Sequence, residues 1–103
     1  MGAWTTVAQT AELAPGQAKA IESNGHAIAL LNVDGTYYAI GNECTHVGGP
    51  LAEGSVAGGM VTCPWHGASF DVQTGKVLSP PAAEDVPTYP VRVEGTEIQI
   101  ELP

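Results

Sequence analysis

Positive charge is scarce in this sequence. Only three of its 103 residues are lysine or arginine (Lys19, Lys76 and Arg92), against eleven aspartates and glutamates, and the formal net charge is −8. A surface of this sign repels phosphate backbones and anionic lipids, so we expect no nucleic acid and no membrane among its partners. We expect instead partners that approach with basic patches of their own.

Long apolar runs are also lacking. No stretch has the roughly 18 apolar residues that would predict a membrane-spanning helix. The segment Met1 to Trp4 has none of the basic residues that begin a secretory signal. We therefore expect a cytoplasmic location. Cysteine is limited to Cys44 and Cys63, and in a reducing compartment paired cysteines more often bind metal or do redox chemistry than form a structural disulfide.

Helix-favouring patterns are few as well. Thirteen glycines and eight prolines predict many tight turns. Apolar residues make up 44% of the chain, close to the globular average, and the length suits one domain, which we place at residues 1–103. Short β-prone runs between the turns predict an all-β fold, a small antiparallel sandwich or barrel.

The clearest strand signal is a hairpin in the first half of the chain. Residues 28–33 and 36–40 flank Asp34-Gly35, a pair that supplies the positive φ angles of a type I′ turn. Further strands are expected at 4–8 and 18–22, separated by a loop.

A second hairpin is expected at the end of the chain. Residues 89–93 and 97–102 flank Glu94-Gly95-Thr96. In the last run, isoleucine and leucine alternate with glutamate and glutamine, which predicts a strand with one buried and one wet face.

Residues 42–81 have a different composition. This region is dense in glycine and proline, and it contains both cysteines and two of the three histidines. Short strands are expected at 60–63, 69–72 and 76–78, whereas Pro80-Pro81 predicts a stiff loop that cannot join a central strand. We predict a β scaffold that carries a functional loop subdomain at about 42–81.

Two mixed pairs within this region indicate metal chemistry. Cys44-Thr45-His46 and Cys63-Pro64-Trp65-His66 each supply one thiolate and one imidazole. Two thiolates and two imidazoles complete the coordination of one metal ion or one small cluster. Each pair follows an expected strand and enters a glycine turn. Two adjacent loops would therefore place Cys44, His46, Cys63 and His66 at one tip.

Structural zinc is the main alternative for this quartet, because Cys₂His₂ is also a zinc coordination shell. Zinc fingers, however, pair cysteine with cysteine and histidine with histidine, as C-x₂₋₄-C and H-x₃₋₅-H. Here each loop supplies one of each type. That arrangement suits a binuclear site better, with both thiolates on one iron and both imidazoles on the other.

The chain resembles the Rieske ferredoxin family through C-T-H at 44–46, C-P-W-H-G at 63–67 and the spacing between them. The resemblance implies the Rieske fold, an antiparallel β-sandwich with a small cluster-binding loop subdomain, and one [2Fe–2S] cluster. By the same resemblance, Cys44 and Cys63 would hold the inner iron. His46 and His66 would hold the outer, redox-active iron near the surface.

The resemblance also implies a function. Such proteins are soluble one-electron carriers rather than enzymes, and they pass electrons from a flavin-dependent ferredoxin reductase to the terminal non-haem iron oxygenase of an aromatic-ring dioxygenase system. We expect a monomer that docks transiently on both partners through the His46/His66 tip. The alternatives are a small subunit of another oxidoreductase such as nitrite reductase, or a zinc-stabilised binding module. An oxygenase subunit is disfavoured, because only His26 remains for its mononuclear iron site.

The sequence departs from the high-potential branch of the family at four positions. Gly49 and Trp65 stand where the Rieske proteins of bc complexes carry two bridged cysteines, and Ala68 and Phe70 stand where those proteins carry serine and tyrosine. Lost hydroxyl donors to sulfur destabilise the reduced state. We therefore expect a potential near the low end of the Rieske range, about −150 mV. Trp65 and the Pro80-Pro81 loop are candidates for shielding the cluster, with simple packing as the alternative for the tryptophan.

Overall fold

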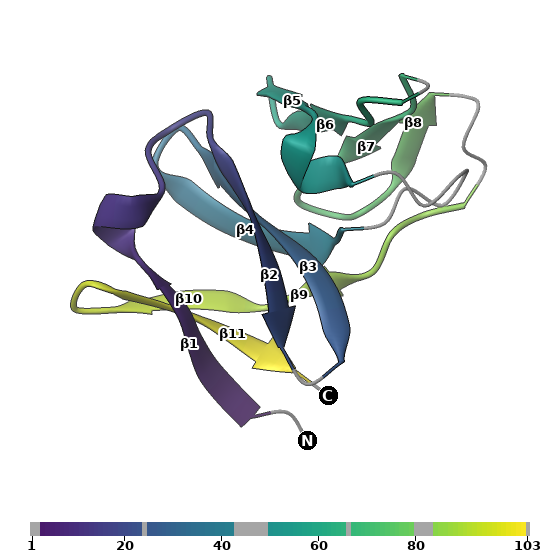
Figure 1. Cartoon of the computed structure of the whole chain (residues 1–103). Helices are drawn as coiled ribbons and strands as arrows, with labels where there is room; N and C mark the ends of the chain where they lie inside the picture. The colour runs from purple at the N-terminus through teal and green to yellow at the C-terminus, as the bar shows by residue number, and fades with distance from the viewer. Residues whose placement is uncertain (1–2, 24, 43–49, 66, 80–83, 103) are drawn as a thin grey trace.

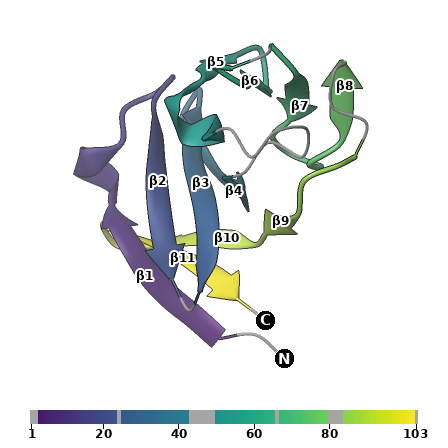
Figure 2. The same ribbon diagram turned by 45° about the vertical axis from the view of Figure 1, so that its right-hand side comes forward.

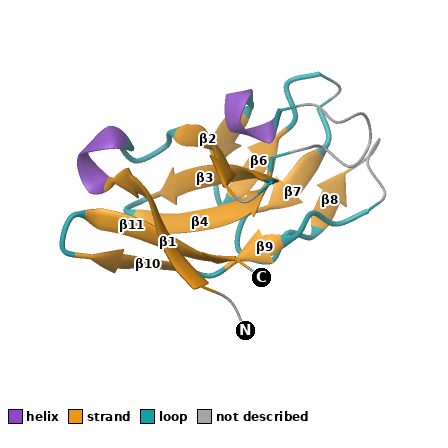
Figure 3. Cartoon of the chain, turned by 60° about the horizontal axis from the view of Figure 1, so that its bottom comes forward, coloured by secondary structure: helices purple, strands orange, loops and turns teal. Residues whose placement is uncertain are grey.

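The computed structural model describes residues 3–23, 25–42, 50–65, 67–79 and 84–102, and strands dominate them. The strands form three antiparallel sheets, with two short 3₁₀ helices between them (Figures 1 and 3). The expected all-β class is confirmed. Within the described residues, no helix has the length and hydropathy needed to cross a membrane.

The first sheet, called here the terminal sheet, joins the two ends of the chain. Its order is β1-β11-β10, and its strands are β1 (Ala3–Gln9), β11 (Glu97–Leu102) and β10 (Val91–Glu94). The expected alternation is confirmed in β11, where Ile98, Ile100 and Leu102 are buried and the residues between them are partly exposed.

The second sheet, the central sheet, has the order β2-β3-β4-β9. Its strands are β2 (Ala18–Ser23), β3 (His26–Val33), β4 (Thr36–Gly41) and β9 (Thr88–Tyr89). The β3–β4 hairpin is confirmed: Asp34 and Gly35 have φ angles of 52° and 92°, as a type I′ turn requires.

The third sheet, the small sheet, has the order β5-β6-β7-β8. It consists of β5 (Ser55–Ala57), β6 (Met60–Thr62), β7 (Ser69–Asp71) and β8 (Val77–Ser79). The 3₁₀ helix η2 (Leu51–Glu53) precedes it, and a second one, η1 (Thr10–Glu12), follows β1. Neither helix nor β5 was expected from the sequence.

The central sheet separates two hydrophobic cores. Ile28 and Leu30 of β3 pack with Ile98 and Ile100 of the terminal sheet, whereas the alternate residues of β3 pack against the small sheet. Figure 2 shows the terminal and small sheets on different sides of β3. A strand buried on both faces needs an unbroken apolar run, which explains the sequence Ile-Ala-Leu-Leu at 28–31.

Pro90 corrects one sequence expectation. Residues 89–93 were expected to form one strand, but β9 pairs with β4 in the central sheet and β10 pairs with β11 in the terminal sheet. Proline has no N–H to donate to a sheet ladder. The chain therefore changes sheets at Pro90.

A buried amide supports the hairpin on the scaffold side. Asn32 of β3 is 2% exposed. Its Nδ2 donates to the carbonyl of Leu13 at 2.9 Å, and its Oδ1 accepts the N–H of Gly35 at 2.8 Å. Both polar ends of the side chain are thus satisfied, as burial requires.

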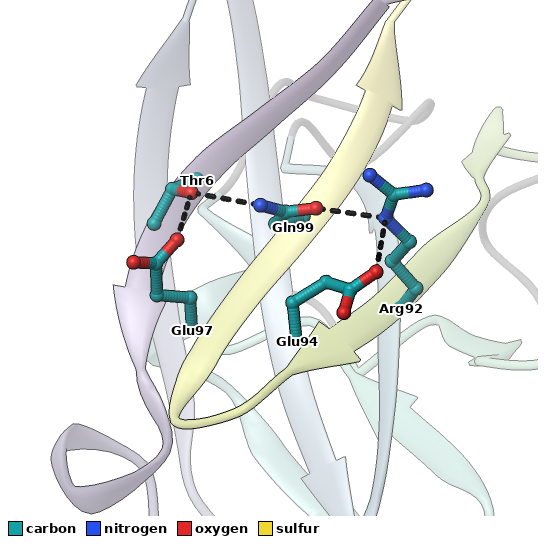
Figure 4. A network of polar contacts seen from close by, with 5 residues as sticks. All are labelled: Thr6, Arg92, Glu94, Glu97 and Gln99. Atoms are coloured by element: carbon teal, nitrogen blue, oxygen red, sulfur yellow. Dashed lines mark hydrogen bonds and ion pairs between the residues drawn. The ribbon is translucent and has the colours of Figure 1, made fainter.

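The outer face of the terminal sheet is covered by a polar network (Figure 4). Gln99 Nε2 donates to Thr6 Oγ1 at 3.2 Å, and Arg92 Nε donates to Gln99 Oε1 at 2.7 Å. The Arg92 guanidinium also stacks over Trp4, 4.3 Å from the ring centroid. One of the three cations of the chain is thereby engaged on the scaffold.

A second cation is paired near the start of the chain. Lys19 Nζ lies 2.6 Å from Glu12 Oε1. The hydrogen bond from Lys19, the hydrogen bond from the Gln9 N–H and the charge of Lys19 lower the pKa of Glu12. Two of the three basic side chains thus already have acidic or polar partners within the chain.

Candidate metal centre

Of the four predicted ligands, Cys63 lies in the described part of the chain. Cys44, His46 and His66 lie outside the described residues. The described residues contain no group of three or more His, Cys, Asp or Glu side chains arranged to hold a metal. The four-residue ligand set therefore remains a prediction. The structure shows how the described segments next to these four residues are held.

Cys63 follows directly after β6 and begins a closed loop. Its N–H donates to the carbonyl of Ala68 at 2.7 Å, and its carbonyl accepts the N–H of Gly67 at 3.1 Å. Gly67 has a φ of 79°, which favours glycine. The loop thus returns the chain to the start of β7, next to the strand it left, as β6 and β7 are paired.

The Cys63 side chain is free and only 2% exposed. It belongs to the core between the central and small sheets, together with Leu51, Val61 and Phe70. A free thiol at the start of a glycine turn, shielded by apolar side chains, is chemically suited to bind iron as a thiolate away from water. The described residues therefore fit the sulfur-bound side of an iron–sulfur centre.

Residues 43–49, which include the predicted ligands Cys44 and His46, are flanked by residues that hydrogen-bond to each other. Residues 43–49 begin after Asn42, and the chain is described again at Pro50. The carbonyl of Asn42 accepts the N–H of Leu51 at 2.7 Å, and its side-chain Oδ1 accepts the N–H of Ala52 at 2.8 Å. The chain therefore leaves and re-enters the described structure at one place.

That place is close to the second ligand loop. Leu51 is fully buried in the same core as Cys63. Gly54, after η2, lies so close to the carbonyl of Thr62 that a Cβ atom at position 54 would overlap it. The end of β6, which precedes Cys63, therefore packs directly against the segment that follows residues 43–49.

A third segment closes on the small sheet. Val86 donates its N–H to the carbonyl of Gly75 at 2.9 Å, and Asp85 Oδ1 accepts the N–H of Val77 at 2.9 Å. These contacts fix the chain that follows Pro80-Pro81, where the sequence predicts a loop that lies outside the described residues.

The structure places four side chains that the sequence analysis discussed: Trp65, Ala68, Phe70 and His26. Trp65 is 57% exposed, so it does not serve as a core residue. Ala68 and Phe70, expected to lack the hydroxyl donors of the high-potential branch, are both fully buried beside Cys63. His26, expected at the surface, is half-buried, and its ring makes a T-shaped contact with the ring of Tyr89, at 6.0 Å between centroids.

Sequence reasoning missed Asn42, Gly54 and Asp85. Each acts through a backbone partner that is several residues away along the chain. The one available signal was the position of Asn42, two residues before Cys44 and two residues after the strand predicted at 36–40.

Comparison with known proteins identifies the family. Residues 3–90 match the model of the Rieske [2Fe-2S] domain. The chain is 44% identical over 94 residues to the 3-phenylpropionate/cinnamic acid dioxygenase ferredoxin subunit of Shigella boydii, covering 90% of this chain and 88% of that protein. It is 35% identical over 99 residues to the ferredoxin component of the naphthalene 1,2-dioxygenase/salicylate 5-hydroxylase systems of a Ralstonia species, covering 96% and 95%.

A solved structure agrees with these relatives. A chain of the complex of reduced oxygenase and oxidized ferredoxin in carbazole 1,9a-dioxygenase superposes with a TM-score of 0.89 at 30% identity, covering 94% of this chain and 91% of that one. Fold, family model and relatives therefore agree. The chain belongs to the Rieske [2Fe-2S] domain family, whose cofactor is a Rieske-type [2Fe–2S] cluster.

Proposed function

We propose that this chain is a one-electron carrier, the ferredoxin component of a ring-hydroxylating dioxygenase system, and not itself an enzyme. The observation that carries the proposal is the buried, free Cys63 on its closed glycine loop, in a chain whose relatives are named as dioxygenase ferredoxins. The cluster, when bound, supplies one reversible electron. The chain holds it, excludes water from its sulfur side and presents its other side to partners.

The ligand assignment is part of the proposal. Cys44 and Cys63 hold the inner iron, and His46 and His66 hold the outer one. The burial of Cys63 in the core supports an inner position for the thiolates. The exposure of Trp65, directly before His66, supports a surface position for the imidazole side.

The proposed partners rest on the likeness to dioxygenase ferredoxins, one of which was solved in complex with an oxygenase. We propose that a flavin-dependent ferredoxin reductase supplies the electron and a terminal non-haem iron oxygenase accepts it. Both would dock transiently at the His46/His66 tip. The net charge of −8 favours basic surfaces on both partners, because opposite charges steer encounter.

The remaining assignments rest on the same role. We propose one domain at residues 1–103 with the cluster-binding subdomain at about 42–81, a monomeric state and a cytoplasmic location. A monomer lets one tip meet two partners in turn. The small sheet, whose strands lie within residues 55–79, supports the position of the subdomain.

The proposal is tested on the purified protein by its visible spectrum, its metal content and the EPR spectrum after reduction. A red-brown protein whose reduced EPR shows a low average g, as imidazole-ligated [2Fe–2S] centres do, supports the proposal. A colourless protein with one bound zinc would establish the zinc-stabilised module instead.

The ligands are tested by substitution with a matched control. His46→Ala and His66→Ala are expected to lose the cluster, whereas His26→Ala is expected to keep it, since His26 lies in the central sheet against Tyr89. Electron transfer reconstituted with purified partners then distinguishes a dioxygenase ferredoxin from a nitrite reductase small subunit. Supply of electrons to a ring-hydroxylating oxygenase supports the ferredoxin, and supply to a nitrite reductase alone would support the small-subunit alternative.

A further inference from the structure

Asn42 makes three hydrogen bonds to other described residues at the point where the chain leaves the central sheet. Its N–H donates to the carbonyl of Ala27 at 3.0 Å, which anchors it to β3. Its carbonyl accepts the N–H of Leu51 at 2.7 Å, and its Oδ1 accepts the N–H of Ala52 at 2.8 Å. Both accepted bonds cross from one end of residues 43–49 to the other.

These two bonds complete the start of η2. The first N–H groups of any helix lack partners within the helix and need a cap. Pro50, which precedes η2, provides no side-chain cap. Asn42 provides the acceptors instead, from eight residues before Pro50. Asparagine suits this role because its amide oxygen accepts as a helix cap does.

We infer that Asn42 is a positioning residue for the metal centre: it sets the separation between the two ends of the segment that carries Cys44 and His46. The inference rests on the proposed ligation by these two residues. The two accepted hydrogen bonds fix Asn42 relative to Leu51 and Ala52. The positions from which the chain departs and to which it returns are thus already ordered, and ordering them costs no further entropy when a ligand binds.

The same contacts link the first ligand pair to the second. Leu51, whose N–H is held by Asn42, is fully buried in the core that contains Cys63. Two residues beyond Ala52, Gly54 packs against the carbonyl of Thr62, which precedes Cys63. A shift of η2 would therefore change where the chain returns from residues 43–49, relative to Cys63.

The test compares Asn42→Ala with Asn42→Asp in the cluster-loaded protein. Alanine removes the acceptor for the Ala52 N–H, whereas aspartate retains an oxygen at the same distance along the side chain. Iron release to a chelator and the g values of the reduced protein are measured below the unfolding temperature. We expect release from Asn42→Ala to be about tenfold faster than wild type, with altered g values, because one hydrogen bond is lost. Asn42→Asp should release iron within about threefold of wild type.

Asn32 provides the matched control. It is also an asparagine that joins two backbone segments, but its partners Leu13 and Gly35 belong to the scaffold. Asn32→Ala should lower the unfolding temperature and leave the g values and the iron-release rate below unfolding unchanged. If Asn42→Ala behaves in the same way, its role is only structural and the inference is wrong.

Two further outcomes are defined. If Asn42→Ala does not fold, Asn42→Gln is measured, because glutamine keeps the amide but displaces it by one methylene. Faster release with altered g values from this variant supports the inference, and wild-type behaviour overturns it. A wild-type protein that binds no cluster refutes the proposed function first, and the inference falls with it.

Discussion

Gly54 packs directly against the carbonyl oxygen of Thr62, leaving no room for a Cβ atom. Its φ of −84° is open to any residue, so the restriction is steric. Because Thr62 is the last residue of β6, this contact fixes the position of the strand end that is followed by the predicted ligand Cys63.

Gly54→Ala is therefore expected to displace β6 and to reduce cluster content. Overpacking of this kind costs about 1–3 kcal/mol of unfolding free energy. Iron per protein and the unfolding temperature would be measured together. Gly58→Ala serves as the control, because Gly58 has a φ of 59° and open space around it. The control should lose stability but keep a full cluster, and equal iron contents would contradict the prediction.

The midpoint potential should fall near the low end of the Rieske range, about −150 mV. Ala68 and Phe70 are fully buried beside Cys63 and offer no hydroxyl to sulfur. Ala68→Ser and Phe70→Tyr should each raise the potential. A new bond that favours the reduced state by about 1.5 kcal/mol corresponds to roughly 60 mV. Protein-film voltammetry gives the values, and a wild-type potential above about +100 mV would rule out this explanation.

Trp65 should be a docking residue. It is 57% exposed and lies two residues after Cys63, and exposed tryptophans often dominate interface energies. Trp65→Ala should raise the KM of the oxygenase for the ferredoxin about tenfold and leave the potential unchanged. Trp4→Ala is the matched control, because Trp4 is 36% exposed on the terminal sheet and stacks on Arg92. Identical KM values for the two variants would show that docking does not use Trp65.

Electron transfer to either partner should slow as salt is added. The chain carries a net charge of −8, and Lys19 and Arg92 already contact acidic side chains of the same chain. We expect the second-order rate constant to fall by about tenfold between low and high ionic strength. Stopped-flow absorbance measures it.

Two charge variants locate the effect. Glu53→Gln, on η2, should weaken the salt dependence. Glu94→Gln, at the distant β10–β11 turn (Figure 1), should change it less. A rate constant that is independent of salt would exclude electrostatic steering.

Removal of iron should loosen one core before the other. Among the described residues, the core between the terminal and central sheets contains no predicted ligand, whereas the core beneath the small sheet contains Cys63. In iron-free protein, amide protection should be lost first in the region 42–81 and persist in β3 and β11, because metal binding contributes to folding. Hydrogen exchange measured by NMR tests this, and native protection in β6 and β7 without iron would contradict it.

The strands with self-contained signals could be predicted from the sequence. The β3–β4 hairpin depends on Asp34-Gly35, and β11 depends on its alternating pattern, so both are legible within a few residues. The proline at position 90 was visible in the sequence, but the change of sheet that it causes could not be predicted. A proline ends a ladder, yet only the pairing partners reveal that the chain moves from one sheet to another.

The type of metal centre could be predicted from the sequence, whereas the backbone contacts that surround it could not. Two cysteines and two histidines at this spacing predict a Rieske cluster, which the family match confirms. Their role as its four ligands stays a prediction. The capping of η2 by Asn42 could not be predicted, because the donors come from Leu51 and Ala52 across residues 43–49. The helix η2 and β5 were missed for the same reason. Three-residue elements have little intrinsic preference, and tertiary contacts determine them.

The pairing of β4 with β9 has a consequence for how this chain can change. Gly41 donates its N–H to the carbonyl of Pro87 at 2.9 Å, and Ala39 and Ile40 pair with Tyr89 and Thr88. Everything between Gly41 and Pro87 therefore departs from and returns to adjacent positions on the scaffold. The insertion is nevertheless not independent of the scaffold, because its apolar side chains cover Ala29, Leu31 and Ile40 of the central sheet. Sequence change within the insertion is therefore free at positions that face away from this core and restricted at positions that pack into it.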